Sequence, residues 1–261
     1  MSNAPSTDNY QLGKGILYFD RFDSDGNGTG ELDLGNAPAF NIGITLDTLD
    51  HFESRSGIRE KDLSVNVSVS SLATFTLDEY SKENIALAIL GAEPSTETQG
   101  SGSVTDEAVT ARHDRWVKLL YRNIKSVVVN DDGGGGVYVI GVDYEVDQSV
   151  GRLKILSTGS IADAAALDVD YVYTSETWNT MLGVSVTAIE GLLRFVGDPD
   201  QGIAYEAEIW KVKLRPTSPM GFISDDWGTI EFEAEIQKDV ANHPTNPWFK
   251  IREEGTAGGG S

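Results

Sequence analysis

The clearest pattern in the chain is a strict alternation of apolar and acidic side chains over residues 229–237. One face of the strand that it predicts holds four apolar residues, Ile230, Phe232, Ala234 and Ile236. The other face holds three glutamates, Glu231, Glu233 and Glu235. Like charges about 7 Å apart repel by roughly 0.6 kcal/mol even at the dielectric constant of water. The acidic face therefore needs an explanation beyond solvation.

Alternation also predicts strands elsewhere. In residues 63–70, apolar residues at the odd positions alternate with Ser and Asn, as in a half-buried antiparallel strand. In residues 203–214 the alternation changes phase, which a bulge near Ile209 or a second buried face against a neighbouring subunit would explain. Further predicted strands are residues 14–22, 39–46, 116–121, 126–129, 137–142, 152–156, 169–173 and 184–190. The number of strands predicts an all-β fold.

One short helix is predicted at residues 81–90, with acidic residues near its start and Gly91 placed to end it. We expect it to cover a sheet. Residues 45–62 are charged and read as a long connection between two strands, longer than a hairpin turn requires. The remaining organisation is an N-terminal arm (1–12), a core domain (13–122 and 181–252), a hairpin-rich insertion (123–180) and a C-terminal tail (253–261).

Composition narrows the possible functions. The 261 residues include 41 acidic and 20 basic residues, a net charge of −21, which disfavours binding to nucleic acid or to an anionic membrane surface. The absence of cysteine excludes disulfides, thiolate catalysis and cysteine metal sites. We see no secretory signal and no apolar run long enough to span a bilayer, so we expect cytoplasmic synthesis and no membrane binding.

The segment Asp23-Ser-Asp-Gly-Asn-Gly resembles the start of a calcium loop, with oxygens from Asp23, Asp25 and Asn27. The twelfth position is Leu34 where such a loop has Glu, and a strand precedes the segment. We therefore predict a hairpin turn here.

The three histidines lie far apart and lack the spacing of a zinc motif. His51 with Asp47, Asp50 and Glu53 could bind a metal, but a charged surface segment is the favoured interpretation. No nucleophile elbow or phosphate loop is present, and paired carboxylates are too common in this chain to mark a catalytic pair. We predict neither an enzyme nor a cofactor.

Taken together, the chain resembles the major tail tube proteins of long-tailed, siphovirus-like bacteriophages. The resemblance covers roughly residues 10–96 and 183–251 and rests on the order of a strand, a long charged connection, a strand, a helix and returning strands. The segments that carry it are residues 40–63, 75–91, 191–199 and 224–236. It implies two packed antiparallel sheets, sandwich-like or barrel-like, with one flanking helix. It also implies homohexameric rings stacked into a tube, with the insertion on the tube exterior.

The resemblance also implies partners, location and site residues. The partners would be further copies of the chain, the tape measure protein and other tail proteins, in a virion assembled in the host bacterial cytoplasm. Viral DNA would pass without specific binding, because a carboxylate-lined lumen repels phosphate. The lumen-lining candidates are Glu231, Glu233, Glu235, Glu206 and Glu208. The inter-ring candidates in residues 45–62 are Asp50, His51, Glu53, Arg55, Arg59, Glu60 and Lys61.

The alternative from another class is a secreted or cell-surface β-sandwich that binds carbohydrate or calcium. The Asp23 turn, the five tryptophans and the acidity would support it. It predicts a monomer whose melting temperature depends on calcium, whereas a tail tube protein predicts rings or tubes.

Overall fold

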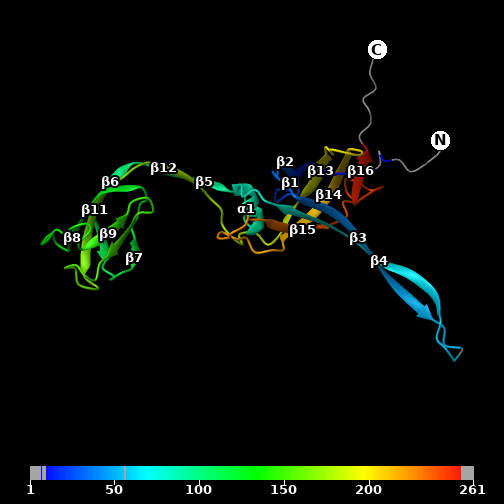
Figure 1. The fold of residues 1–261 in the computed structure, drawn as a ribbon, viewed down its shortest axis with the longest axis horizontal. Helices are drawn as coiled ribbons and strands as arrows, with labels where there is room; N and C mark the ends of the chain where they lie inside the picture. The colour runs from blue at the N-terminus through cyan, green and yellow to red at the C-terminus, as the bar shows by residue number, and fades with distance from the viewer. Residues whose placement is uncertain (1–6, 8–9, 56, 254–261) are drawn as a thin grey trace, which may run out of the picture. The chain divides into compact units, whose positions relative to one another are not determined.

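The computed structural model describes residues 7, 10–55 and 57–253, which form two compact units (Figure 1). Residues 1–94 and 181–261 form the first, here called the core unit, and residues 95–180 form the second, here called the inserted unit. All the sheets are antiparallel, and the described residues contain one α-helix. The predicted all-β fold with one short helix is confirmed. Most of the predicted terminal arms, 1–12 and 253–261, lie outside the described residues.

The core unit is built on one eight-stranded sheet with the strand order β2-β1-β13-β14-β15-β4-β3 and with β16 beside β14. Its strands are β1 (Gly15–Phe22), β2 (Gly28–Asp33), β3 (Ala39–Phe52), β4 (Lys61–Leu77), β13 (Ile189–Gly197), β14 (Tyr205–Pro216), β15 (Ile230–Ile236) and β16 (Phe249–Glu253).

The apolar side chains of these strands form one core. All four apolar residues of the predicted strand in residues 229–237 are at most 3% exposed, and Phe232 stacks on Phe75 of β4 with ring centroids 5.0 Å apart. Phe40 of β3 stacks on Phe195 of β13 at 5.3 Å. Because β3 ends the sheet and β13 lies on the other side of β14, this contact shows that the sheet curls over itself. The strand order does not close into a barrel.

The helix α1 (Lys82–Ala88) lies on this core, as expected. Ser81 caps its start, where the side-chain oxygen accepts a hydrogen bond from the Asn84 amide at 3.1 Å. Leu87 is buried in the core cluster. Leu90 adopts the left-handed backbone conformation at the end of the helix, with φ of 51°.

The inserted unit contains two three-stranded sheets, β6-β11-β8 and β7-β10-β9, and a two-stranded ribbon, β5-β12. It has a hydrophobic core of its own. Its strands are β5 (Ser95–Gln99), β6 (Gly102–Thr110), β7 (Trp116–Lys118), β8 (Ile124–Asp131), β9 (Tyr144–Asp147), β10 (Arg152–Ile155), β11 (Ala166–Tyr173) and β12 (Glu176–Thr180).

The predicted start of the insertion at residue 123 is wrong by 28 residues, although its end at residue 180 agrees. Residues 95–122 supply β5, β6 and β7, and each of these strands pairs only with a strand of the inserted unit. The ladder partners are far apart in sequence, so local patterns could not assign residues 95–122 to the insertion.

Several predicted strands are corrected. Residues 137–142 form isolated bridges only, and residues 184–188 are not a strand because β13 begins at Ile189. The phase change in β14 is a bulge, since the register with β13 shifts between Gly191–Val212 and Leu193–Ile209. No helix among the described residues is long and apolar enough to cross a membrane.

The unit boundary can be tested by deletion. Ser95 and Thr180 are directly paired, so their Cα atoms lie about 5 Å apart and a Gly-Ser-Gly linker can replace residues 95–180. We expect this variant to keep a cooperative thermal transition and a β-type circular dichroism spectrum. Deleting residues 123–180 instead leaves β5, β6 and β7 without partners, and we expect this variant to aggregate. Equal behaviour of the two deletions would contradict the boundary at Ser95.

Candidate functional site

The acidic residues of β15 lie on the sheet face turned away from the core, here called the outer face. Glu231, Glu233 and Glu235 alternate with the buried apolar residues of the same strand. Arg215 of β14 pairs with Glu233, and its Nε donates to Oε2 at 2.9 Å; Lys213 is the register partner of Glu235. Opposite charges on neighbouring strands therefore offset the repulsion along β15.

Glu206 and Glu208 lie on the outer face of β14, inside a cluster of ion pairs. Arg194 of β13 binds Glu31 through Nε at 2.6 Å, and its Nη1 contacts both Glu206 and Glu208. Arg252 of β16 completes the cluster with an Nη2–Oε2 distance of 2.6 Å to Glu208. Glu208 is only 7% exposed. Two arginines thus hold together carboxylates from two different strands.

The environment of Glu208 changes its ionisation. Burial by itself raises the pKa of Glu208, but hydrogen bonds from Arg252 and Arg194 outweigh burial and lower the pKa below 4.5. The folded state therefore favours the ionised carboxylate. This contribution to stability is present above the unfolded pKa and is lost as the pH falls through the lowered value.

The structure brings the five lumen-lining candidates onto one sheet face. Their surroundings differ from the expected carboxylate lining, because Arg194, Arg215, Arg252 and Lys213 lie among them. Sequence reasoning missed these basic residues. The signal was present in part, since Lys213 and Arg215 alternate with apolar residues of β14 just as the glutamates of β15 do.

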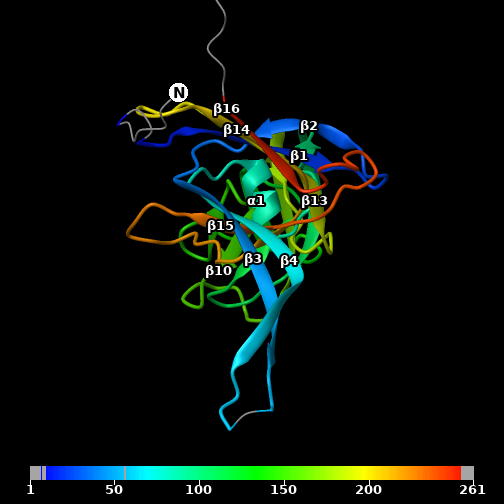
Figure 2. The ribbon, with the colours of Figure 1, turned by 90° about the vertical axis from the view of Figure 1, so that its right-hand side faces the viewer.

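The predicted long connection at residues 45–62 is corrected to the distal half of a β-hairpin. β3 continues to Phe52 and β4 starts at Lys61, so the strands cover most of the predicted connection. Figure 2 shows the two strands running beyond the rest of the core unit. We call residues 44–70 the hairpin arm. Two paired strands satisfy backbone hydrogen bonds with each other, so a charged segment can form an extended hairpin instead of a loop.

The hairpin arm has apolar side chains that the described residues do not bury. Leu46 and Val69 are opposed and continue the face that carries Phe40 and Phe75 in the core. β4 has one extra residue between Ser68 and Asn66, so beyond this bulge the opposed pair Leu49–Val65 lies on the opposite face. The predicted burial of the odd positions in residues 63–70 is therefore wrong for the single chain. Seven apolar side chains of the arm are at least 50% exposed: Ile44, Leu46, Leu49, Leu63, Val65, Val67 and Val69.

The polar side chains of the hairpin arm pair with one another. Asp50 accepts a hydrogen bond from the Ser64 hydroxyl and pairs with Lys61, both at 2.7 Å, and these contacts lower its pKa, the Lys61 contact most. His51 Nδ1 lies 2.6 Å from Asp62. Of the inter-ring candidates, Asp50, His51 and Lys61 lie in strands, whereas the turn carries Glu53, Arg55, Arg59 and Glu60.

The Asp23 segment forms a hairpin turn between β1 and β2, as predicted. One carboxylate oxygen of Asp23 accepts hydrogen bonds from the backbone amides of Asp25 and Asn27, both at 2.9 Å. In the part of the chain that the structure describes, no group of three or more His, Asp or Glu residues could hold a metal ion.

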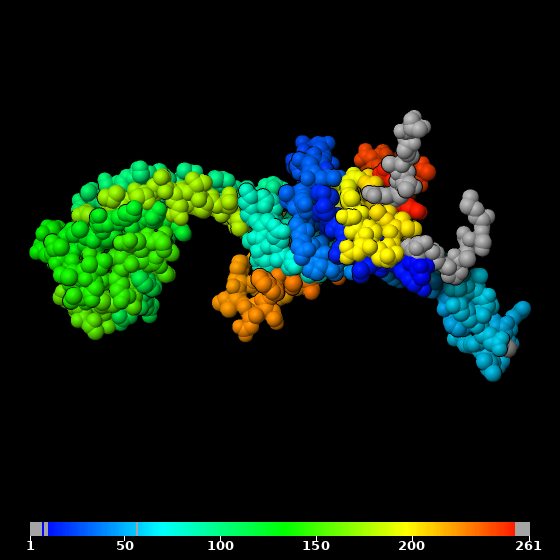
Figure 3. All heavy atoms as spheres, turned by 45° about the horizontal axis from the view of Figure 1, so that its top comes forward, coloured from blue at the N-terminus to red at the C-terminus, as the bar shows by residue number. Residues whose placement is uncertain are grey.

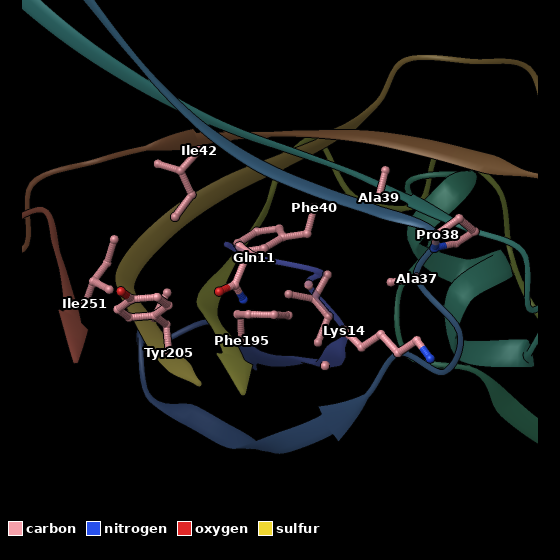
Figure 4. A pocket seen from close by; sticks show the side chains of 14 residues that line it. Gln11, Lys14, Ala37, Pro38, Ala39, Phe40, Ile42, Phe195, Tyr205 and Ile251 are labelled. Carbon is pink, nitrogen blue, oxygen red and sulfur yellow. The ribbon is translucent and has the colours of Figure 1, made fainter. Parts of the chain in front are cut away.

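A cavity of about 570 Å³ opens between β3 and the strands that it crosses (Figure 4). Its lining is mostly apolar and includes the stacked Phe40 and Phe195 together with Tyr205 and Ile251, and Lys14 is the charged residue of the lining.

The fold and these surfaces define an all-β protein whose main exposed features are a charged sheet face, an apolar hairpin arm and an apolar cavity. The chain belongs to the family described as "Protein of unknown function UCP028589", which matches residues 10–247. No curated protein matches the chain.

The role of Glu208 can be tested through the pH dependence of stability. Glu208→Gln removes charge-assisted hydrogen bonds, so we expect a loss of roughly 1.5–3 kcal/mol at pH 7. We also expect a smaller decrease in melting temperature between pH 6 and pH 3.5 than in the wild type, since one carboxylate with a lowered pKa is gone. Calorimetry would measure both. The control Glu231→Gln, on the same face but exposed, should change neither, and an unaltered pH dependence in Glu208→Gln would contradict the role of Glu208.

Proposed function

We propose that the chain is a structural virion protein, the major tail tube subunit of a long-tailed phage. Six copies form a ring, and stacked rings enclose the conduit for DNA during ejection. The observation that carries this proposal is the hairpin arm, whose apolar side chains are exposed in the single chain. The proposal locates the protein in the virion, with the tape measure protein and other tail proteins as partners.

The exposed apolar side chains of the hairpin arm have an energetic consequence. Burying one Val or Leu side chain fully is worth about 1.5–3 kcal/mol, and seven large aliphatic side chains lie exposed along the arm, on both of its faces. A monomeric protein that left them in water would forgo that free energy and would be prone to association. Contact of the arm with neighbouring copies in an assembly would bury them.

The open edges of the sheet support the same proposal. Among the described residues, β2 and β3 each lack a partner on one side. Exposed edges tend to pair with other chains, and a closed assembly satisfies them. In a ring with cyclic symmetry the β2 edge of one copy would meet the β3 edge of the next, so six curled sheets can continue into one barrel.

The outer face of β14 and β15 is the proposed lining of the conduit. It carries Glu231, Glu233 and Glu235 together with Lys213 and Arg215, so it is mildly rather than uniformly acidic. Since the basic residues face carboxylates on neighbouring strands, they are less available to phosphate. A lining that neutralises few phosphates releases few counterions and holds DNA weakly. DNA would therefore pass without binding.

The arm can be tested with isosteric changes. Val65→Thr, Val67→Thr and Val69→Thr together keep the shape and strand propensity of the arm but put a hydroxyl in place of one methyl group on each of three exposed side chains. We expect negative-stain microscopy to show rings or tubes for the wild type and their loss in this variant. Thermal stability of the single chain should change little, because these side chains are at least half exposed.

The matched control is Ser64→Thr, Ser68→Thr and Ser70→Thr, at serines next to these valines in the same strand. It keeps every hydroxyl, and we expect it to form rings or tubes as the wild type does. Tubes from the valine variant, or a monomer in every preparation of the wild type, would contradict the proposal.

The lining can be tested by charge reversal. Glu231→Lys, Glu233→Lys and Glu235→Lys together should allow tubes to form and should slow DNA release from virions several-fold, because a basic lining binds phosphate. Release can be followed with a DNA-binding dye. Adding Lys213→Glu and Arg215→Glu restores two opposed pairs, so this five-residue variant should recover most of the rate. Unchanged release in the triple variant would show that this face does not line the conduit.

A further inference from the structure

The loop between β14 and β15, residues 217–229, exposes large apolar side chains that the proposed function does not use. Phe222 is 78% exposed, Ile223 98% and Trp227 96%. Figure 3 shows this loop, in orange, standing out from the core unit. Tyr80 contacts the loop through its hydroxyl, which donates to the Gly221 carbonyl at 3.3 Å. The three side chains therefore project into solvent.

Such a loop has the composition of an interface anchor. Tryptophan is the residue most enriched among the side chains that dominate binding energy, and it contributes most when a pocket encloses it. Asp225 and Asp226 precede Trp227 directly. The loop therefore offers an apolar tip with two negative charges beside it, which calls for an apolar pocket with a positive rim.

The cavity beneath β3 is apolar and has one basic residue, Lys14, in its lining. Figure 4 shows Phe40, Phe195, Tyr205 and Ile251 facing its interior. Its volume of about 570 Å³ lies within the range of about 300–1,000 Å³ that encloses a drug-sized molecule, which is larger than an indole and a butyl group together. Lys14 lies in the lining and pairs with Asp200 at 2.5 Å, with both side chains more than half exposed. This surface ion pair can exchange partners at little cost.

The loop and the Tyr205 end of the cavity lie at opposite ends of one strand. Tyr205 begins β14, and the loop follows Pro216 at its end. At about 3.3 Å per residue, the 12 residues of β14 separate the two features by roughly 35 Å. The Tyr205 and Ile251 end of the recess is therefore far from the loop of the same copy, and the two can meet between copies, head to tail. Repetition of a head-to-tail contact builds a ring or a helical filament.

We propose that Ile223 and Trp227 of one copy insert into the cavity lined by Phe40, Phe195, Tyr205 and Ile251 of a second copy. Asp225 and Asp226 would then approach Lys14 at the rim. The inference deepens the proposed function and rests on it for the ring, but the contact is a separate pair of surfaces from the hairpin arm.

The absence of cysteine from the chain makes disulfide trapping a direct test. Ile223→Cys places a thiol on the loop, and Ile251→Cys places one at the cavity; Ile251 is 53% exposed. The two variants carry tags of different size and are mixed at low micromolar concentration under mild oxidation. We expect a mixed disulfide dimer at a yield at least fivefold above that of a control mixture. The control pairs Ile251→Cys with Val137→Cys, an exposed residue of the inserted unit.

A second measurement uses Trp227→Ser in the Ile223→Cys chain. Because Trp227 is 96% exposed in the single chain, this change should leave its melting temperature unaltered and lower the yield of the mixed dimer at least fivefold. A yield equal to that of the control mixture, or one insensitive to Trp227→Ser, overturns the docking.

The outcomes separate this inference from the proposed function. Rings or tubes in the microscope without the specific disulfide would leave the tail tube proposal standing and overturn the docking. The specific disulfide in a protein that forms neither rings nor tubes would support the docking and overturn the tail tube proposal.

Discussion

The core unit depends on the packing of one curled sheet against itself. Phe75 and Phe232 stack on adjacent strands, and Phe40 of the edge strand reaches Phe195 across the fold. Since only the concave face takes part in this packing, every strand keeps a second face in contact with water. The charged outer face, the open edges and the free length of β3 and β4 all follow from that one arrangement.

The outer face shows how an acidic chain limits its own repulsion. Arg194 and Arg252 hold Glu206 and Glu208 in one cluster, and Arg215 pairs with Glu233. The basic residues are few but stand where carboxylates from different strands converge. The net charge of −21 is therefore an overall property, whereas the local field on this face is mixed. A conduit lining built from this face would bind DNA weakly for two reasons: its carboxylates repel phosphate, and few of its basic side chains are unpaired.

Local sequence patterns predicted the elements whose side-chain periodicity matches their burial in the folded chain. The strand over residues 229–237, the bulge near Ile209, the helix capped by Ser81 and the Asp23 turn were all readable, because each depends on a few neighbouring residues. The hairpin arm was not, since alternation at Leu63 to Val69 looks the same whether the apolar face is covered or exposed. The start of the inserted unit was missed because β5 pairs with β12, about 80 residues later in the chain.

The sequence by itself determined the all-β class, the two faces of the main strands and the acidic balance, because side-chain period and composition are local quantities. Tertiary structure alone decided which apolar residues found cover. It left Val65 and Trp227 exposed, buried Glu208 between two arginines and opened the cavity beside Phe40. The physical reason is that burial depends on which distant strands pack together. The sequence of a single strand shows its hydrogen-bonding groups and its apolar area, but it does not specify which strands will cover them.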